Sequence, residues 1–266
     1  MPQPSTVALA ATVHHPDERM APLMTLHLES LVRRYPVATA YCSLETHPTI
    51  VELLEAHGVR VCISNSASGG IDGIGHVRRE TIQAGLEAGT SHLHMCDFDR
   101  ALHWAAHYLE ELDQVVEEIT GYDFLVLGRT PRAWATHPPY QAETEPFFNR
   151  VFALTTGQDW DIGAGSRGLS CRAAEALLAT SRESTVGVDA EWPLLLLNRP
   201  GFRVGYRPCE GLEFETADRY GPEIERAGGY AAWEALTCAQ PEIWSFRLRI
   251  AWLIAEAVLR YGRPEA

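Results

Sequence analysis

Short apolar segments alternate with longer amphipathic segments through most of this 266-residue chain. Val7–Val13 is apolar enough for a buried strand, and the leucines within residues 19–35 recur at helical spacing. Further strands are predicted at residues 37–43, 59–63, 91–99, 122–127 and 202–207, and further helices at 47–57, 76–88, 101–119, 147–154, 172–180 and 190–198. Tyr230–Tyr261 is predicted to hold two more helices, with Pro241 between them. This alternation favours an α/β fold in which helices cover both faces of a mostly parallel sheet.

The predicted strand at 91–99 ends in two carboxylates, Asp97 and Asp99. Residues two apart in an extended chain point to the same face, so we expect both side chains at the carboxyl end of this strand. Ligands bind at that edge of open α/β sheets. Converging carboxylates repel unless a cation lies between them, and Mg2+ or Mn2+ prefers oxygen ligands. The pattern predicts a metal site for a nucleoside diphosphate; the alternative is that the pair caps the helix beginning near Ala101.

Composition narrows the classes of partner. The net charge is −13, from 22 basic and 35 acidic residues, which argues against a nucleic-acid binder. No apolar export segment precedes Val7, and the apolar stretch Ile250–Leu259 is interrupted by Glu256 and too short to span a bilayer. The six cysteines are widely spaced with no Cys-x-x-Cys pair, which is typical of reduced thiols. We therefore expect a cytoplasmic protein without a membrane span.

Proline and glycine mark the internal divisions of the chain. The proline-rich segment 131–146 is the predicted boundary between two halves of one domain, so we expect a nucleotide-sugar half at 1–130, an acceptor half at 131–220 and a C-terminal helical extension at 221–266. The Ser/Gly-rich residues 64–75 are predicted to form a loop. An amphipathic stretch at 244–253 is interpreted as packing, either in the core or in a homodimer formed through the C-terminal helices; the alternative is peripheral contact with a membrane surface.

Several short motifs stand in the order found in GT-A glycosyltransferases, which the chain resembles over about residues 7–215. They are Pro16-Asp17-Glu18 after the first strand, Gly73-Ile74-Gly75-His76-Val77-Arg78-Arg79 before the carboxylate strand, Gly165-Ser166-Arg167-Gly168-Leu169-Ser170-Cys171-Arg172 before a helix, the acidic pair Asp189 and Glu191, and Pro200-Gly201-Phe202-Arg203-Val204-Gly205 in a late strand. The resemblance, to family 2-like members, implies a GT-A-like, Rossmann-type mixed sheet that is mostly parallel and flanked by helices. It leaves the C-terminal helical extension unexplained.

The resemblance also implies roles for individual residues. Asp97 and Asp99 would hold a Mg2+ or Mn2+ ion and the diphosphate. Metal-dependent members often add a late histidine ligand; no histidine follows His137 here, so a carboxylate among Glu210, Glu213 and Glu215 would replace it, and Glu213 is the candidate. The donor nucleotide and its phosphates would meet Thr12, His14, Glu18, Gly73, Gly75, Arg78 and Arg79, the arginines because a helix start and a guanidinium both favour anions.

The acidic pair Asp189 and Glu191 stands where inverting members place the base that takes the proton from the acceptor hydroxyl. The alternative is that Asp189 only caps a helix ahead of Pro193.

These features predict a metal-dependent glycosyltransferase that moves a sugar from a UDP- or GDP-linked donor to a hydroxyl of a small molecule or glycan. Two alternatives stay open: a nucleotidyltransferase that forms a nucleotide sugar, and a non-catalytic nucleotide-sugar-binding protein of the same fold. The first would carry a basic, glycine-rich loop after its first strand, where this chain has His14-His15-Pro16-Asp17. A dehalogenase-type phosphatase is rejected, because its Asp-x-Asp pair belongs on the first strand. The sequence leaves the nucleotide base, the sugar, the acceptor and the stereochemical course open.

Overall fold

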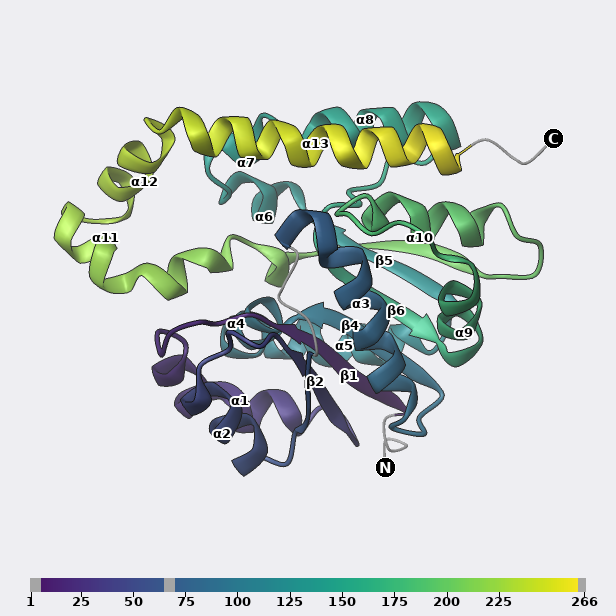
Figure 1. The fold of residues 1–266 in the computed structure, drawn as a ribbon, viewed down its shortest axis with the longest axis horizontal. Coiled ribbons are helices and arrows are strands. Elements are labelled where there is room, and N and C mark those ends of the chain that lie inside the picture. Colours follow the sequence, from purple (N-terminus) through teal and green to yellow (C-terminus); the bar gives the residue numbers. More distant parts are fainter. Residues whose placement is uncertain (1–5, 65–69, 263–266) are drawn as a thin grey trace.

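A computed structural model describes residues 6–64 and 70–262, and within them one sheet of seven strands runs through the molecule (Figure 1). The strand order is β3-β2-β1-β4-β6-β5-β7. The strands are β1 (Val7–Val13), β2 (Ala38–Cys42), β3 (Arg60–Ile63), β4 (His92–Asp97), β5 (Phe124–Arg129), β6 (Ser166–Ser170) and β7 (Val204–Cys209). Strand β6 pairs antiparallel with both β4 and β5, and every other pairing is parallel. The fold class predicted from the sequence, a mixed and mostly parallel sheet flanked by helices, is confirmed.

The order of the strands creates a crevice between β1 and β4. From β1 the chain moves outward to β2 and β3, then crosses back to β4 on the other side of β1. The connections leave β1 and β4 in opposite directions, which is the topological switch point where open α/β sheets bind ligands. Thr12 and Asp97 are register partners across this point. The sheet therefore places the first and fourth strand ends beside each other.

Helices cover both faces of the sheet, and the C-terminal helix runs alongside α8 (Figure 1). The α-helices are α1 (Ala21–Val32), α2 (Pro48–Ala56), α3 (Gly70–Leu86), α4 (Phe98–His107), α5 (Leu109–Ile119), α6 (Pro131–Ala135), α7 (Pro139–Ala142), α8 (Glu145–Thr156), α9 (Cys171–Thr180), α10 (Val188–Leu197), α11 (Gly221–Ala227), α12 (Tyr230–Cys238) and α13 (Pro241–Tyr261). Two short 3-10 helices, η1 (Glu210–Leu212) and η2 (Glu215–Tyr220), follow β7. No helix among the described residues is long and apolar enough to cross a membrane.

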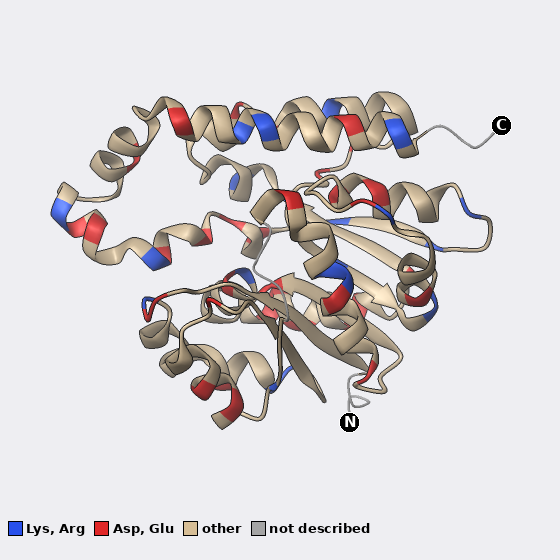
Figure 2. Ribbon diagram, viewed as in Figure 1, with Lys and Arg blue, Asp and Glu red and all other residues tan. Residues whose placement is uncertain are grey.

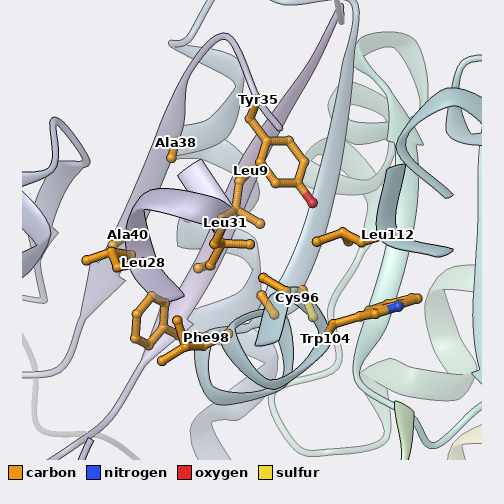
Figure 3. Close-up of a cluster of buried hydrophobic side chains, with 14 of the residues drawn as sticks. Leu9, Leu28, Leu31, Tyr35, Ala38, Ala40, Cys96, Phe98, Trp104 and Leu112 are labelled. Atoms are coloured by element: carbon orange, nitrogen blue, oxygen red, sulfur yellow. The ribbon is translucent and has the colours of Figure 1, made fainter. Parts of the chain in front are cut away.

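Alternate residues of β1 point into two separate hydrophobic cores, one on each face of the sheet. Val7, Leu9, Ala11 and Val13 point to one face, where helices α1, α2, α4 and α5 pack, as Figure 3 shows for part of this cluster. Ala8 points to the other face, which α3, α8, α9, α10 and α13 cover. A strand buried on both faces has no polar side to alternate with, and this explains why β1 is a continuous apolar run.

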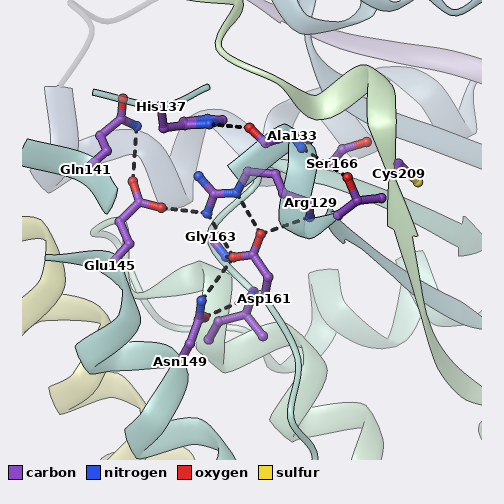
Figure 4. A network of polar contacts seen from close by, with 12 residues as sticks. Arg129, Ala133, His137, Gln141, Glu145, Asn149, Asp161, Gly163, Ser166 and Cys209 are labelled. Atoms are coloured by element: carbon purple, nitrogen blue, oxygen red, sulfur yellow. Dashed lines mark hydrogen bonds and ion pairs between the residues drawn. The ribbon is translucent and has the colours of Figure 1, made fainter. Parts of the chain in front are cut away.

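A buried arginine network joins the end of β5 to α8 and to the loop before β6 (Figure 4). The Arg129 guanidinium donates to both oxygens of Asp161, at 2.7 and 2.8 Å, and to Glu145 at 2.6 Å. Asn149 donates to Asp161 at 3.1 Å, and the Trp134 ring lies 4.0 Å from the guanidinium. Burial opposes the charge of Arg129, but the two carboxylates outweigh it and raise its pKa. The network therefore satisfies three charges that the core would otherwise leave unpaired.

Three predicted boundaries need correction. Asp97 ends β4 as expected, but Asp99 lies in the first turn of α4 rather than on the strand. Residues 70–75 of the predicted loop belong to α3; residues 65–69 lie outside the described part of the chain. The single helix predicted at 101–119 is two helices, because Tyr108 leaves the helical region with φ −136°. Helices α6 and α7, in the segment predicted as a proline-rich boundary, and strand β6, in the glycine-rich segment, were not predicted. Helix α11 and the two 3-10 helices have no strong apolar period and were not predicted either.

Candidate functional site

The carboxyl ends of four parallel strands open into one cavity of about 420 Å³. Its walls come from the residues that follow β1, β2, β3 and β4, from α3, and from η2 and α13. Side chains at the strand ends are polar and include His14, Tyr41, Ser43 and Ser64. The opposite wall is apolar and is formed by Ile71, Ile74, Val77, Val186 and Phe246. Such a crevice, apolar with a few convergent polar groups, is the usual form of a small-molecule site.

Asp97 is fixed at the base of this cavity. The Thr12 hydroxyl donates to its Oδ1 at 2.6 Å, which follows from the register between β1 and β4. Its Oδ2 lies 3.9 Å from a guanidinium nitrogen of Arg78 and 3.9 Å from Arg100 Nε. Gly165, with φ +67°, passes so close that a Cβ there would lie 2.7 Å from Oδ2. Only glycine leaves Asp97 in this orientation without strain.

Asp99 and Glu215 bring two more carboxylates to the same cavity. Glu215, on η2, is almost fully buried; Arg100 lies 3.2 Å from its Oε1, and its buried Oε2 has no hydrogen-bond partner among the described residues. Burial raises the pKa of Glu215, and the negative charge of Asp99 raises it further, although Arg100 opposes both effects. Arg219 lies 3.7 Å from Asp99 Oδ2. The site thus gathers three carboxylates, and one carboxylate oxygen faces no donor.

Behind Asp97 lies a second layer of buried charge. Arg78, from α3, contacts Asp189, from α10, through a short hydrogen bond, and Arg167 also donates to Asp189 at 3.1 Å. Burial lowers the pKa of Arg167, whereas for Arg78 the charges of Asp189 and Asp97 outweigh burial and raise it. The predicted residues Arg78, Asp97 and Asp189 are therefore brought together by three separate elements. Asp189 does not line the cavity itself.

Other predicted residues serve local structure. Glu18 turns toward α2, where Thr49 donates to it at 3.1 Å. Arg79 donates to the Glu183 carbonyl at 2.6 Å, and Glu191 accepts from the backbone N–H groups of residues 182 and 183. Both side chains therefore hold the turn between α9 and α10 and lie outside the residues that line the cavity.

The glycines of the predicted phosphate loop lie within α3 instead. A Cβ at Gly75 would lie 2.3 Å from the Glu183 carbonyl, so this glycine permits close packing against the same turn. Gly73 has nothing within 4 Å of where a Cβ would lie. Neither glycine is among the residues that line the cavity.

Glu213, the predicted third metal ligand, faces away from the cavity lining. It accepts hydrogen bonds from His103 Nε2 at 3.1 Å and from the Tyr108 hydroxyl at 3.0 Å, and it pairs with Arg132. Glu215, two residues later, lines the cavity. Phe214 between them is buried, and η2 begins at Glu215. Glu215 therefore belongs to a helical turn, and the rule that residues two apart in an extended chain share a face does not apply to this pair.

Several residues that line the cavity were not predicted as site residues. Arg219, Tyr41 and Phe246 belong to none of the family-like motifs, and they line the same cavity as Asp99 because the sheet, η2 and α13 come together there. Ser43 is the exception that could have been found, because His14 and Ser43 follow adjacent strands and hydrogen-bond at 2.8 Å. Of the predicted nucleotide residues, Thr12 and His14 lie in the cavity wall.

Comparison with known proteins places this architecture. No protein-family model matches the chain, and no curated protein matches it significantly in sequence. Among solved structures, a mycobacterial protein superposes with a TM-score of 0.51 at 13% identity, covering 85% of this chain and 76% of that one. Glucosyl-3-phosphoglycerate synthase from Mycobacterium tuberculosis gives a TM-score of 0.50 at 13% identity, covering 85% and 82%. That synthase is also known in complex with Mn2+, uridine diphosphate and phosphoglyceric acid (TM-score 0.49, 14% identity, 85% and 80% covered). At this identity the likeness shows the fold: the chain has the GT-A-type fold of glucosyl-3-phosphoglycerate synthase.

Proposed function

We propose that this chain is a glycosyltransferase that moves a sugar from a nucleoside-diphosphate sugar to an acceptor hydroxyl and uses Mg2+ or Mn2+. Asp97 and Asp99 hold the metal and the diphosphate. Glu215, rather than Glu213, supplies the further carboxylate. The support is the position of this cavity, which lies at the switch point of a GT-A-type sheet. Asp97 at the end of β4, Asp99 in the first turn of α4 and Glu215 on η2 all line it.

The buried oxygen of Glu215 carries the metal part of the proposal. A carboxylate oxygen with no hydrogen-bond partner, buried beside a second carboxylate, is costly unless a proton or a cation is present. All the candidate ligand atoms are carboxylate oxygens, which suits a hard divalent ion. When bound, such an ion neutralises the charge that develops on the leaving diphosphate.

The remaining residues act on the donor. Arg219 projects into the cavity and adds positive charge beside Asp99, which favours a diphosphate there. His14, Tyr41 and Ser43 line the strand-end side of the cavity, where they would contact the nucleoside. Asp189 acts through Arg78 and Arg167 and keeps their charge beside Asp97, so we assign it a positioning role. Among the described residues that line the cavity, the carboxylates that can take the proton from the acceptor hydroxyl are Asp97, Asp99 and Glu215.

A thermal-shift panel tests the proposal. UDP, GDP, CDP and their sugars are each added with Mn2+, Mg2+ or EDTA, because a ligand that binds only the folded state raises Tm. We expect one nucleotide to raise Tm in the presence of metal and the effect to disappear in Asp99→Asn. Asp113→Asn, a half-exposed carboxylate on α5, removes the same charge away from the cavity and should keep the shift. If no nucleotide shifts Tm, or if EDTA leaves the shift intact, the metal-dependent assignment fails.

The products formed with the nucleotide that raises Tm then identify the reaction. A glycosyltransferase releases the nucleoside diphosphate from its sugar donor. A nucleotidyltransferase would instead consume a nucleoside triphosphate and a sugar phosphate and release pyrophosphate. Diphosphate release from the sugar donor, lost in Asp99→Asn and kept in Asp113→Asn, is the result expected here.

A further inference from the structure

A second cluster of ligand-type side chains lies one turn along α4 from Asp99. His103 and His107 stand four residues apart on that helix, and Asp218 faces them from η2. One ligand atom from each of the three residues lies within 4.8 Å of the other two. His103 Nδ1 and Asp218 Oδ2 are 2.7 Å apart, and the two imidazole rings are 4.5 Å apart between centroids. Two imidazoles and a carboxylate thus converge at the end of α4.

We infer that this cluster is a binding site for a Zn2+-type transition-metal ion, separate from the oxygen-only site in the cavity. Histidines at i and i+4 lie on the same helical face and can chelate one ion. Imidazole nitrogen with one carboxylate suits Zn2+, Co2+ or Ni2+, whereas Mg2+ prefers oxygen alone. His107 is exposed and Asp218 is 24% exposed, so an ion can reach the site from solvent. The ion would take the place of the hydrogen bond between His103 Nδ1 and Asp218.

The surroundings of His103 support this assignment. When Nδ1 carries a metal, Nε2 carries the hydrogen and needs an acceptor, and metal-bound histidines usually find one in a carboxylate. Here Glu213 accepts from Nε2 at 3.1 Å and is itself held by Tyr108 and Arg132. The outer contact is therefore built in advance and fixes the orientation of the ring. Glu213, which was predicted from the sequence as a ligand of the cavity metal, thus supports the neighbouring site instead.

An ion at this position would hold η2 against α4. The histidines belong to α4 and Asp218 to η2, so the ion joins two elements that are more than a hundred residues apart in sequence. The same short helix carries Glu215 and Arg219 into the cavity. The site therefore sits where it can steady one wall of the proposed active site without contacting a ligand in the cavity.

Isothermal titration of EDTA-treated, desalted protein with ZnCl2, in millimolar Mg2+ to fill the oxygen site, tests the inference. We expect one Zn2+ per chain, a rise in Tm on binding, and visible absorption when Co2+ replaces Zn2+. His107→Ala removes an exposed ligand and should abolish this binding without harming the fold. Glu213→Gln should weaken it by roughly 10- to 100-fold, as changes to such outer partners do.

Two control variants keep the test decisive. His27→Ala removes a histidine on α1 and should leave binding unchanged. Asp99→Ala removes the cavity ligand and should also leave it unchanged, so the two metal sites, and the failure of either proposal, are told apart. The inference is overturned if the wild type binds no Zn2+, if His107→Ala binds as well as the wild type, or if Asp99→Ala loses the ion along with His107→Ala.

Discussion

Asp97 owes its orientation to neighbours on several sides, and one of them leaves no room for a methyl group. Thr12 donates to Oδ1, Arg78 and Arg100 approach Oδ2, and Gly165 lies against it. Gly165 begins one of the family-like motifs, but the reason for a glycine there is a long-range contact and a positive φ. A residue without a side chain therefore helps to define the proposed metal site.

We expect Gly165→Ala to abolish the metal-dependent nucleotide shift in Tm. A Cβ 2.7 Å from Asp97 Oδ2 displaces the carboxylate, and the left-handed backbone adds about 1–2 kcal/mol of strain. Gly201→Ala is the matched control, because residue 201 also has a positive φ, +89°, but nothing lies within 4 Å of the new Cβ. It should lose similar stability and keep the shift. A full nucleotide shift in Gly165→Ala would contradict the role given to Asp97.

The buried His94 makes stability depend on pH. The Tyr35 hydroxyl lies 2.7 Å from its Nδ1 and the Ser166 hydroxyl 2.9 Å from its Nε2, and burial lowers its pKa from 6.5 to about 3. Between these values the unfolded chain binds a proton that the folded chain excludes, so the free energy of unfolding falls as pH drops below about 6.5.

Urea unfolding at several pH values measures this effect. We expect His94→Gln to be less stable than the wild type at pH 7 and the difference to shrink by about 1.4 kcal/mol per pH unit below about pH 6. His27→Gln, which changes a partly exposed histidine, should run parallel to the wild type. A constant gap between His94→Gln and the wild type would show that His94 is not the group responsible.

At the scale of elements, the long helices and every strand except β6 were predictable from local pattern, and the site elements were not. Strand β1 is apolar on both faces, and α1 repeats its leucines at helical spacing, so both elements can be recognised from the sequence. Helix α4 begins earlier than predicted, and this moves Asp99 from strand to helix. Segment η2 has no apolar period, yet it carries Glu215 and Arg219, which line the cavity. Glu191 and Arg79 match family positions but hold a turn, which only the tertiary contacts reveal.

The arginine network in Figure 4 joins the end of β5 to α8 and to the loop before β6. Arg129→Met would leave Asp161 and Glu145 buried without their cation, so we expect a loss of about 3–5 kcal/mol in the free energy of unfolding. Arg33→Met makes the same chemical change in an exposed pair with Glu29 on α1 and should cost less than about 0.5 kcal/mol. Chemical denaturation of both variants gives the comparison. Equal small losses would mean that the network contributes little to stability.

At the scale of the whole molecule, the C-terminal helix is part of the core rather than an appendage. Figure 2 shows charges of both signs along α13, while Ala251, Ile254, Ala257 and Val258 on its other side are buried in the cluster that also contains Ala8 of β1. Phe246 of the same helix lines the cavity. The division of the chain at residue 221 stays a prediction from composition; the packing indicates that the last segment and the sheet unfold together.

Ile254→Ala tests this coupling. Truncation of a fully buried isoleucine should cost about 2–5 kcal/mol, and because the helix shares its core with the sheet, the loss should appear in one cooperative transition of the whole chain. Leu248→Ala, on the same helix but 53% exposed, should change stability by less than about 0.5 kcal/mol. Urea unfolding followed by both tryptophan fluorescence and far-UV circular dichroism gives the measurement. If the two probes separate in Ile254→Ala, with the helices lost before the sheet, the C-terminal segment folds as an independent unit and the sheet holds the cavity's strand-end side without it.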